Sequence, residues 1–157
     1  MDLVPAINRP ELCRMRVCVL AVVLAFSAPP CLAQTPDVPD WANSFLRSWY
    51  SSYNRGDAAA VAALFSEDAR LLDLKGRASI RKAMADDFAK TKYQCAGGFD
   101  GFRLLGDLAV GWGGESCRET SRDNGKATDT KERWLLVFER AGPNEWLLVR
   151  ETYESLE

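Results

Sequence analysis

A regular row of aromatic residues is the first periodic feature of the chain. Between residues 40 and 56 an aromatic side chain recurs at every fourth position: Trp41, Phe45, Trp49 and Tyr53. This spacing places the four rings on one face of an α-helix, which indicates an amphipathic helix packed against a core. Asp40 is a suitable N-cap residue, and Gly56 is a suitable end for the helix.

Two further helices and a strand are predicted before residue 90. Asp57 is placed to cap a short helix over residues 58–68, AAAVAALFSED, whose alanines allow close approach of another element. Residues 69–74, ARLLDL, have the composition of a strand. After a turn at Lys75-Gly76, a third helix carries three apolar residues on one face: Ile80, Met84 and Phe88.

The second half of the chain is predicted to form four strands. They cover residues 92–105, 108–119, 127–140 and 145–153. Turn residues separate them, including Asn124-Gly125, which is a strong hairpin signal, and AGPN at residues 141–144. Helices followed by an antiparallel meander predict an α+β domain in which a curved sheet wraps the helices.

The N-terminal segment has the pattern of an export signal. Two arginines precede an apolar run over residues 17–26, VCVLAVVLAF, which is too short to cross a bilayer as a stable helix. Small residues suit cleavage after Ala33. We therefore expect a periplasmic or secreted protein with three parts: a signal peptide (1–33), a polar linker (34–39) and a single domain (40–157).

Charge and composition narrow the set of partners. The 157 residues include 20 basic and 22 acidic ones, for a formal net charge of −2. Acids and bases are interspersed, so no basic face points to nucleic acid. We expect no nucleic-acid partner, and no membrane attachment after removal of the signal.

The chain contains no histidine. This absence excludes Ser-His-Asp and Cys-His catalysis, histidine zinc sites and histidine general bases. Proton chemistry would have to use carboxylates, tyrosines or lysines. The sequence also has no glycine-rich phosphate loop, acylating nucleophile motif or metal-ligand spacing, and we expect neither a metal nor a cofactor.

Two cysteines remain after removal of the signal, Cys95 and Cys117. In an oxidising compartment such a pair suggests a disulfide. If a hairpin turn is centred on Gly106, the two cysteines lie directly opposite each other, whereas a bulge at Gly97-Gly98 would break that register. The alternative is a pair of free, buried thiols.

With these elements in place, the chain resembles the SnoaL-like and ketosteroid-isomerase-like superfamily, also called nuclear transport factor 2-like. It is most similar to a branch of small bacterial domains, many of them exported, and the resemblance covers residues 40–156. Its most specific pieces are the Gly56-Asp57 junction, LFSEDA leading into the first strand, Gly76 before the third helix, GDLA at residues 106–109, and Trp146.

The resemblance implies a cone-shaped fold. Three helices would pack on the concave face of a curved, mostly antiparallel sheet, with a pocket at the open end. It also implies a homodimer formed through sheet surfaces. The superfamily includes isomerases, cyclases, dehydratases, transport factors and binding modules, so the fold does not name a reaction.

Asp73 is the candidate catalytic residue. In the ketosteroid isomerases the general base is an aspartate at the end of the first strand, and EDARLLD (67–73) resembles that pattern with Asp73 on the base. Those enzymes also need an oxyanion hole made of a tyrosine and a protonated acid. Here Trp49 stands in the tyrosine's place, and Leu135 and Leu136 occupy the strand expected to hold the acid, which argues against steroid isomerisation. Asp73 is thus a general base, a polar contact or a turn residue.

Aromatic residues and one arginine are the candidate ligand contacts. Five aromatic residues lie on elements expected to line or floor the cone: Trp49, Tyr53, Trp112, Trp134 and Phe138. Apolar walls with a few polar groups are typical of small-molecule sites, although tryptophans at this spacing also suit a core. Arg150 is predicted to share a strand face with Trp146 and Leu148. It could reach an acidic ligand or Asp73, or form a surface salt bridge.

Two functions are compatible with these residues. The first is an exported domain whose cone-shaped pocket binds a small apolar or amphipathic molecule, or which acts as a dimeric interaction module. The second is a cofactor-free isomerase, cyclase or hydrolase with Asp73 as general base. Replacing Asp73 by asparagine distinguishes them, because catalysis requires the carboxylate whereas binding should change only modestly.

Overall fold

The computed structural model describes residues 37–156, so the predicted signal peptide and the first half of the predicted linker lie outside the described residues. Three helices and six strands follow in chain order: α1 (Asp40–Arg55), α2 (Ala58–Ala63), β1 (Phe65–Leu71), β2 (Leu74–Lys75), α3 (Arg77–Phe88), β3 (Thr91–Leu105), β4 (Leu108–Ser121), β5 (Ala127–Gly142) and β6 (Glu145–Ser155). Within residues 37–156, no helix combines the length and the apolarity needed to span a bilayer.

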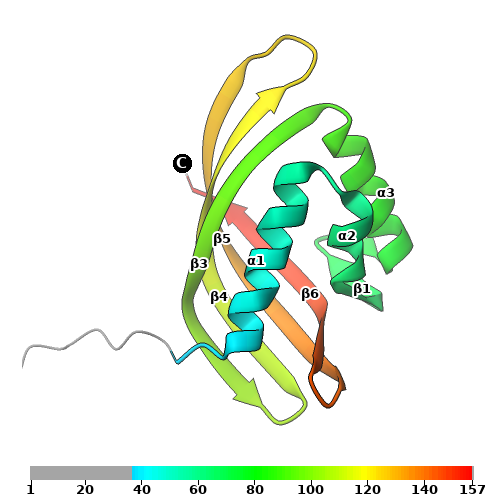
Figure 1. Ribbon diagram of the computed structural model, residues 1–157, viewed down its shortest axis with the longest axis vertical. Coiled ribbons are helices and arrows are strands. Elements are labelled where there is room, and N and C mark those ends of the chain that lie inside the picture. Colours follow the sequence, from blue (N-terminus) through cyan, green and yellow to red (C-terminus); the bar gives the residue numbers. More distant parts are fainter. Residues whose placement is uncertain (1–36, 157) are drawn as a thin grey trace, which may run out of the picture. The chain divides into compact units, whose positions relative to one another are not determined.

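The strands form one sheet in the order β2-β1-β6-β5-β4-β3. Neighbouring strands are antiparallel except β1 and β6, which run parallel. Figure 1 shows the long strands β3, β4 and β5 curving around α1, with α2 and α3 close to β1. The predicted α+β fold is confirmed, with three helices on the concave face of a mostly antiparallel sheet.

The aromatic row of α1 packs on the sheet, as its spacing predicts. The rings of Trp41 and Phe45 both lie edge-on to Phe138, at centroid distances of 5.4 and 4.9 Å. Gly56 ends the helix in a left-handed conformation with φ of 70°. Asp40 is the first residue of the helix itself, so the prediction that it is the N-cap is wrong by one position.

The second helix is shorter than predicted, and the first strand begins earlier. Asp57 caps α2 through a 3.0 Å hydrogen bond, but the helix ends at Ala63. Phe65 then begins β1, where it is fully buried and pairs with Leu148 of β6. Burying a phenylalanine ring is worth about 2 kcal/mol, whereas helix propensities differ by only about 0.7 kcal/mol per residue among ordinary residues. Packing therefore outweighs the local helical pattern of residues 64–68.

The β3–β4 hairpin differs from the prediction in two details. Leu105 pairs with Leu108, so the turn consists of Gly106 and Asp107, and its centre lies between these two residues. A bulge is present, but it lies between Phe99 and Gly101. The predicted strand boundaries agree with the structure to within two residues at this hairpin.

These two differences compensate each other at the cysteines. Counted from the turn, a hairpin without a bulge would place Cys95 opposite Arg118. The extra residue, Asp100, moves the register by one position and places Cys95 opposite Cys117. The two residues form the predicted disulfide, and the bulge is what brings them together.

A second bulge changes which residues of β6 face the helices. The pairing of β6 with β5 skips Val149. Arg150 therefore does not share a face with Leu148, contrary to the simple alternation assumed from the sequence. Arg150 is exposed, whereas Glu151 turns towards the helices and is buried.

Aromatic rings fill part of the concave face. A Cβ atom added at Gly111 would lie 2.4 Å from the ring of Phe99. One added at Gly113 would lie too close to the backbone carbonyl oxygen of Gly98 and 2.6 Å from the ring of Trp134. Side chains at either glycine would displace these rings, so both positions require glycine. This stretch of the sheet is solid core, and open space begins further along β4, from Glu115 onwards.

Candidate functional site

A cavity of about 300 Å³ lies between helices α1 and α3 and the concave face of the sheet. Four aromatic side chains line it: Trp49, Tyr53, Tyr93 and Tyr153. Five carboxyl groups also line it: Asp87, Glu115, Glu119, Glu132 and Glu151. The lining is completed by Leu71, Met84 and Cys117. We call this space the acidic cavity.

Strand alternation turns several of these carboxyl groups inward. On β4, Glu115, Cys117 and Glu119 are two residues apart and share the face that the helices cover. Glu132 of β5 pairs directly with Glu115, so two carboxyl groups are neighbours across the strands. Like charges in directly opposite positions destabilise a sheet, so this arrangement is not explained by stability.

Glu151 is the most deeply buried carboxyl group of the acidic cavity. The residue is 7% exposed, and its Oε2 atom has no hydrogen-bond partner among the described residues. Burial raises its pKa to about 8, and the charges of Glu115 and Glu132 act in the same direction. A buried polar atom without a partner costs about 1–3 kcal/mol, so Glu151 destabilises the unliganded domain.

Glu115 is the second carboxyl group of the acidic cavity with a shifted pKa. Burial raises this pKa to about 7, a hydrogen bond from the hydroxyl of Tyr50 lowers it, and the charge of Glu132 raises it. Burial also raises the pKa of Tyr50, so its hydroxyl stays protonated and able to donate. Glu115 and Glu151 therefore both change protonation state close to neutral pH.

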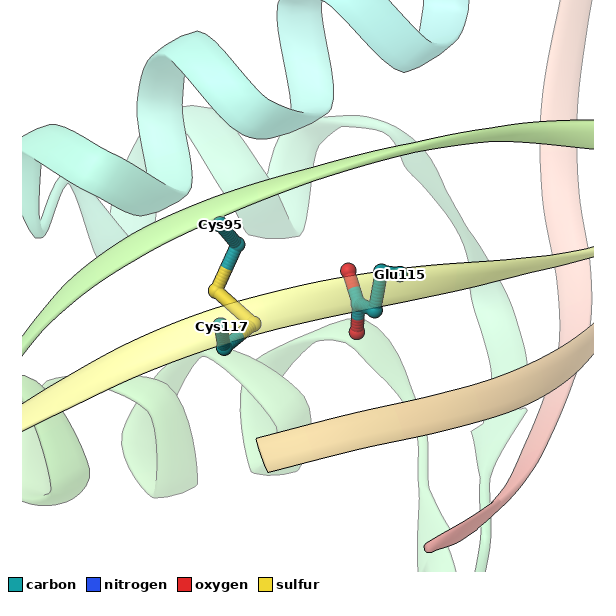
Figure 2. A group of neighbouring side chains, drawn as sticks. All are labelled: Cys95, Glu115 and Cys117. Atoms are coloured by element: carbon teal, nitrogen blue, oxygen red, sulfur yellow. A yellow bond between two sulfur atoms is a disulfide. The ribbon is translucent and has the colours of Figure 1, made fainter. Parts of the chain in front are cut away.

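Figure 2 shows the disulfide next to Glu115. Its Cys117 belongs to the lining of the acidic cavity. Within residues 37–156, Cys95, Glu115 and Cys117 form the only group of three possible metal ligands whose ligand atoms lie within 4.8 Å of one another. Because the two sulfur atoms are bonded to each other, this group offers no thiolate ligand while the disulfide is intact. Asn54 fixes α1 here: its amide donates to the Cys95 carbonyl at 2.9 Å and accepts from the Cys95 N–H at 2.7 Å.

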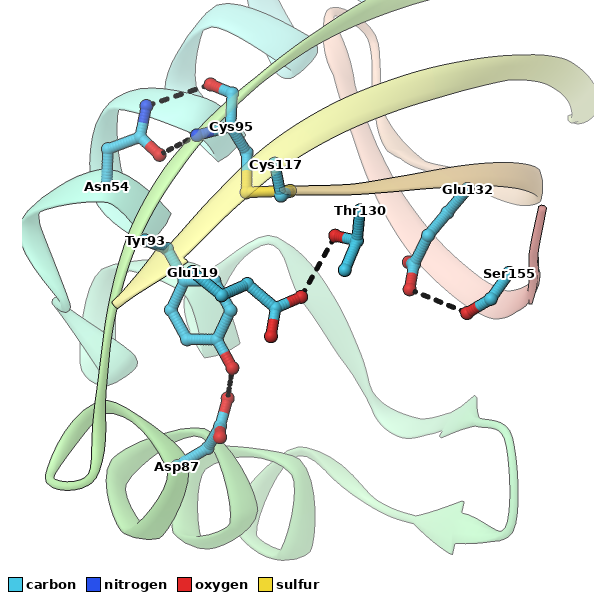
Figure 3. Close-up of a disulfide and its surroundings, with 9 residues drawn as sticks. All are labelled: Asn54, Asp87, Tyr93, Cys95, Cys117, Glu119, Thr130, Glu132 and Ser155. Carbon is cyan, nitrogen blue, oxygen red and sulfur yellow. Dashed lines mark hydrogen bonds between the residues drawn. A yellow bond between two sulfur atoms is a disulfide. The ribbon is translucent and has the colours of Figure 1, made fainter. Parts of the chain in front are cut away.

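Three of the five carboxylates are held in place by neighbouring hydroxyl groups, which Figure 3 shows around the disulfide. The donors and acceptors are Tyr93 to Asp87 (2.7 Å), Thr130 to Glu119 (3.0 Å) and Ser155 to Glu132 (3.2 Å). These bonds fix the outer carboxylates. The buried Oε2 of Glu151 has no such partner among the described residues.

The structure separates the predicted ligand contacts into three groups. Trp49 and Tyr53 line the acidic cavity. Trp134 is buried in the core and borders a small space beside Glu115 and Glu151. Trp112 and Arg150 lie on the convex face of the sheet, where Trp112 is 40% exposed. Trp112 lies on this face because its neighbours in the strand, Gly111 and Gly113, face the helices. Arg150 lies there because the bulge at Val149 shifts the alternation of β6.

Asp73 lies outside the acidic cavity. It is an exposed residue in the turn between β1 and β2, two positions beyond Leu71, which does line the cavity. The structure therefore does not group Asp73 with Trp49 and Tyr53. Its role as a general base stays a prediction.

The glutamates of the acidic cavity carry no motif, and sequence reasoning missed them. A usable signal was present in Cys117. A disulfide on β4 is expected to face the core, so Glu115 and Glu119, two residues to either side, had to share that face. For Glu151 no such signal exists, because its direction depends on the bulge at Val149.

The convex face of the sheet carries an apolar area of its own. Three exposed residues of β4 and β5 contribute to it: Leu108, Trp112 and Leu135. Trp112 and Leu135 pair with each other across the two strands. They border a hollow of about 350 Å³ that also contacts Arg133 and Glu154.

Comparison with solved structures identifies the fold. One match is a ketosteroid isomerase-like protein from Erwinia carotovora atroseptica SCRI1043, with a TM-score of 0.66 and 16% identity over 73% of this chain and 93% of that chain. A nuclear transport factor 2-like superfamily protein from Salmonella enterica serovar Typhimurium LT2 matches with a TM-score of 0.63 and 17% identity, over 73% and 87%. ActVI-ORFA from Streptomyces coelicolor matches with a TM-score of 0.61 and 18% identity, over 73% and 94%.

The chain therefore has the ketosteroid-isomerase-like, nuclear transport factor 2-like fold that the sequence resemblance predicted. No family model matches the sequence, and no curated protein matches it. At these identities the likeness concerns the fold alone. Function has to be argued from the acidic cavity.

Proposed function

We propose that this protein is an exported small-molecule-binding domain whose ligand occupies the acidic cavity. The observation that carries the proposal is Glu151. This buried residue belongs to the lining of the acidic cavity, and one oxygen of its carboxyl group has no hydrogen-bond partner among the described residues. Small-molecule sites are typically concave, with apolar walls and a few polar groups that orient the ligand. The acidic cavity combines these features within one domain.

A purely structural role leaves Glu151 unexplained. A buried polar atom without a partner destabilises the folded state by about 1–3 kcal/mol, and an apolar residue of similar size would avoid this penalty. The neighbouring pair of Glu115 and Glu132 adds electrostatic repulsion. Groups that lower stability are expected where function requires them. A ligand that donates a hydrogen bond to Oε2 of Glu151 would remove the penalty and stabilise the domain.

The lining favours an amphipathic ligand over a purely apolar one. Trp49 and Tyr53 on α1 supply apolar walls, and the carboxyl groups on the sheet supply polar contacts. The volume of about 300 Å³ is at the lower end of the range for small-molecule sites, about 300–1,000 Å³. The ligand is accordingly a small compound with one polar end.

Native mass spectrometry of the protein purified from the periplasm of its own host tests this proposal. We expect a small-molecule adduct that survives native ionisation and is lost on denaturation. The adduct should be weaker or absent in Glu151→Gln and unchanged in Glu154→Gln, a control on the same strand that is exposed. An adduct-free protein whose melting temperature is also unchanged by a library of small amphipathic molecules would contradict the proposal.

Proton-transfer catalysis is a second candidate, and the pKa values of Glu115 and Glu151 favour it. Carboxyl groups that titrate near neutral pH are suited to general acid-base catalysis. A cofactor-free isomerase, cyclase or hydrolase would use one of them as acid or base, with Asp73 as the base inferred from the sequence. If Asp73 is that base, Asp73→Asn abolishes turnover of a bound substrate and leaves its affinity nearly unchanged. If a cavity carboxyl group acts instead, Glu115→Gln has that effect.

We also propose that the protein is a periplasmic or secreted homodimer. The disulfide supports an oxidising compartment. Exposed Leu108, Trp112 and Leu135 on the convex face support a second copy as partner, because monomeric proteins rarely leave large apolar patches open. N-terminal sequencing of the exported protein tests the signal cleavage, and we expect the mature chain to begin at Gln34.

A further inference from the structure

The charges that line the acidic cavity are unbalanced. Five carboxyl groups from α3, β4, β5 and β6 surround it, and among the described residues no lysine or arginine belongs to its lining. Charges that are removed from water are usually paired with an opposite charge or neutralised by protons. The balancing positive charge is therefore absent from the wall of the cavity.

The sheet keeps its basic side chains away from this space. Three arginines are adjacent in sequence to inward-facing glutamates: Arg118, Arg133 and Arg150. Strand alternation and the β6 bulge place all three on the opposite, convex face. There Arg118 forms a 3.4 Å ion pair with Asp129, and Arg133 borders the convex hollow. The arginines next to these glutamates therefore lie on the side of the sheet away from the acidic cavity.

The spacing of the carboxyl groups does not suit a compact metal ion. Calcium and magnesium need six or more oxygen atoms at about 2.0–2.6 Å from the ion. Within residues 37–156, the only three possible ligands that converge within 4.8 Å are Glu115 and the two disulfide sulfur atoms. The five carboxyl groups do not converge on one point, which favours an organic cation over a compact metal ion as the balancing charge.

The aromatic residues are suited to the rest of such a molecule. Trp49 and Tyr53 stack on each other at a centroid distance of 5.9 Å, and Tyr93 lies 4.9 Å from Tyr53 at a steep angle. Aromatic faces attract cations and also provide apolar contact area. The hydroxyl of Tyr93 is already used in its hydrogen bond to Asp87, so its ring has a fixed position.

We propose that the acidic cavity recognises a small organic ammonium ion, a protonated amine with an apolar tail. The ammonium N–H groups would donate to the carboxyl groups of Glu151 and Glu115, which both line the cavity. The tail would lie against Trp49 and Tyr53. This inference rests on the proposed function, because it assumes that the acidic cavity is the ligand site and names the chemical class of the ligand.

Cation binding in this site competes with protons. The pKa values of about 7 for Glu115 and about 8 for Glu151 mean that both are largely protonated below neutral pH. The other acids that face Glu151 across the cavity are Asp87, Glu119 and Glu132. The facing tyrosines are Tyr50, Tyr53, Tyr93 and Tyr153, all with raised pKa values, so they stay neutral. Affinity for an ammonium ion is therefore expected to rise between pH 5.5 and pH 8.

Isothermal titration calorimetry with three probes of similar shape tests the inference: 2-phenylethylamine, 2-phenylethanol and phenylacetate. At pH 8 these are a cation, a neutral molecule and an anion. We expect the amine to bind at least about tenfold more tightly than the alcohol, a difference of about 1.4 kcal/mol, and phenylacetate not to bind. The preference for the amine should decrease at pH 5.5.

Variants assign the preference to the site. We expect Glu151→Gln to remove the preference for the amine over the alcohol, whereas Glu154→Gln should keep it. If Glu151→Gln does not fold, Glu115→Gln serves as the second variant. An amine preference that survives in both cavity variants would overturn the inference, because the cation would then bind elsewhere.

The outcomes also separate this inference from the proposed function. Equal binding of amine and alcohol, or retention of a neutral or anionic adduct in native mass spectra, would refute the ammonium ligand and keep the acidic cavity as a binding site. Absence of binding by all three probes, combined with adduct-free protein in native mass spectra, would refute both.

Discussion

Glu151 occupies a position in β6 whose neighbours on both adjacent strands are apolar. It pairs with Leu136 of β5 and with Leu71 of β1. A leucine or methionine at this position would continue the core without an unsatisfied polar atom. The carboxyl group of Glu151 therefore does not stabilise the fold, and a functional role is the better explanation for its presence.

Replacement of Glu151 by glutamine is expected to stabilise the protein at pH 8 and to have little effect at pH 5. The pKa of Glu151 rises from 4.5 to about 8 on folding, so the folded state holds a proton that the unfolded chain releases. Stability therefore decreases as the pH rises through this window. Since one pKa unit corresponds to about 1.4 kcal/mol, the loss is roughly 2–4 kcal/mol, and glutamine removes it.

Urea unfolding followed by circular dichroism at both pH values measures this difference. Glu154→Gln is the matched control, because this glutamate of the same strand is exposed and should follow the unmodified protein at both pH values. Parallel pH dependence of the unmodified protein and Glu151→Gln would show that Glu151 does not titrate as described.

Helices and strands whose apolar residues recur at regular spacing could be predicted from the sequence. Bulges of a single residue could not. The aromatic row identified α1, and the turn residues placed β3 to β6 to within two residues. The boundary between α2 and β1 was misplaced because Phe65 is held by a distant partner, Leu148. The bulges at Asp100 and Val149 leave no trace in the hydrophobic pattern, yet they determine the cysteine register and the direction of Glu151.

Two single-residue deletions in β3 test the bulge. Deletion of Asp100 removes the unpaired residue and leaves every other pair with β4 in place, so we expect an intact disulfide and little loss of stability. Deletion of Arg103 can keep the cysteines opposite each other only if the bulge straightens, which turns Phe102 from the helix side to the convex face. Loss of this ring from the core is expected to cost about 3–5 kcal/mol.

Urea unfolding and thiol counting under denaturing, non-reducing conditions measure both variants. The expected result is no free thiol in the mature Asp100 deletion and a clearly lower free energy of unfolding for the Arg103 deletion. Two free thiols in the Asp100 deletion, or equal stability of the two variants, would contradict the register described here.

At the scale of the whole domain, the two faces of the sheet have different roles. The concave face holds the helices, the disulfide and the acidic cavity, and the convex face carries exposed apolar residues and outward-facing arginines. A second copy that covers Trp112 and Leu135 would leave the acidic cavity untouched. Dimerisation and ligand binding are therefore expected to be independent.

Trp112→Glu is expected to convert a homodimer into a monomer without unfolding it. A charge placed at the centre of an apolar interface leaves a buried, unpaired group, whereas the same charge on a free surface is harmless. Leu104→Glu is the control, because Leu104 is exposed but follows the alternation of the helix-facing side. Size-exclusion chromatography with light scattering measures the masses, and a monomeric unmodified protein would refute the dimer.

The position of β6 has a consequence for the order in which the molecule can be assembled. Among the described strands β6 is the last to be synthesised, yet it lies between β1 and β5 and joins the first half of the chain to the meander. Until it emerges, β1 and β2 are not paired with the rest of the sheet, and the acidic cavity lacks Glu151. The complete sheet, and with it the complete acidic cavity, can therefore form only after β6 has been synthesised.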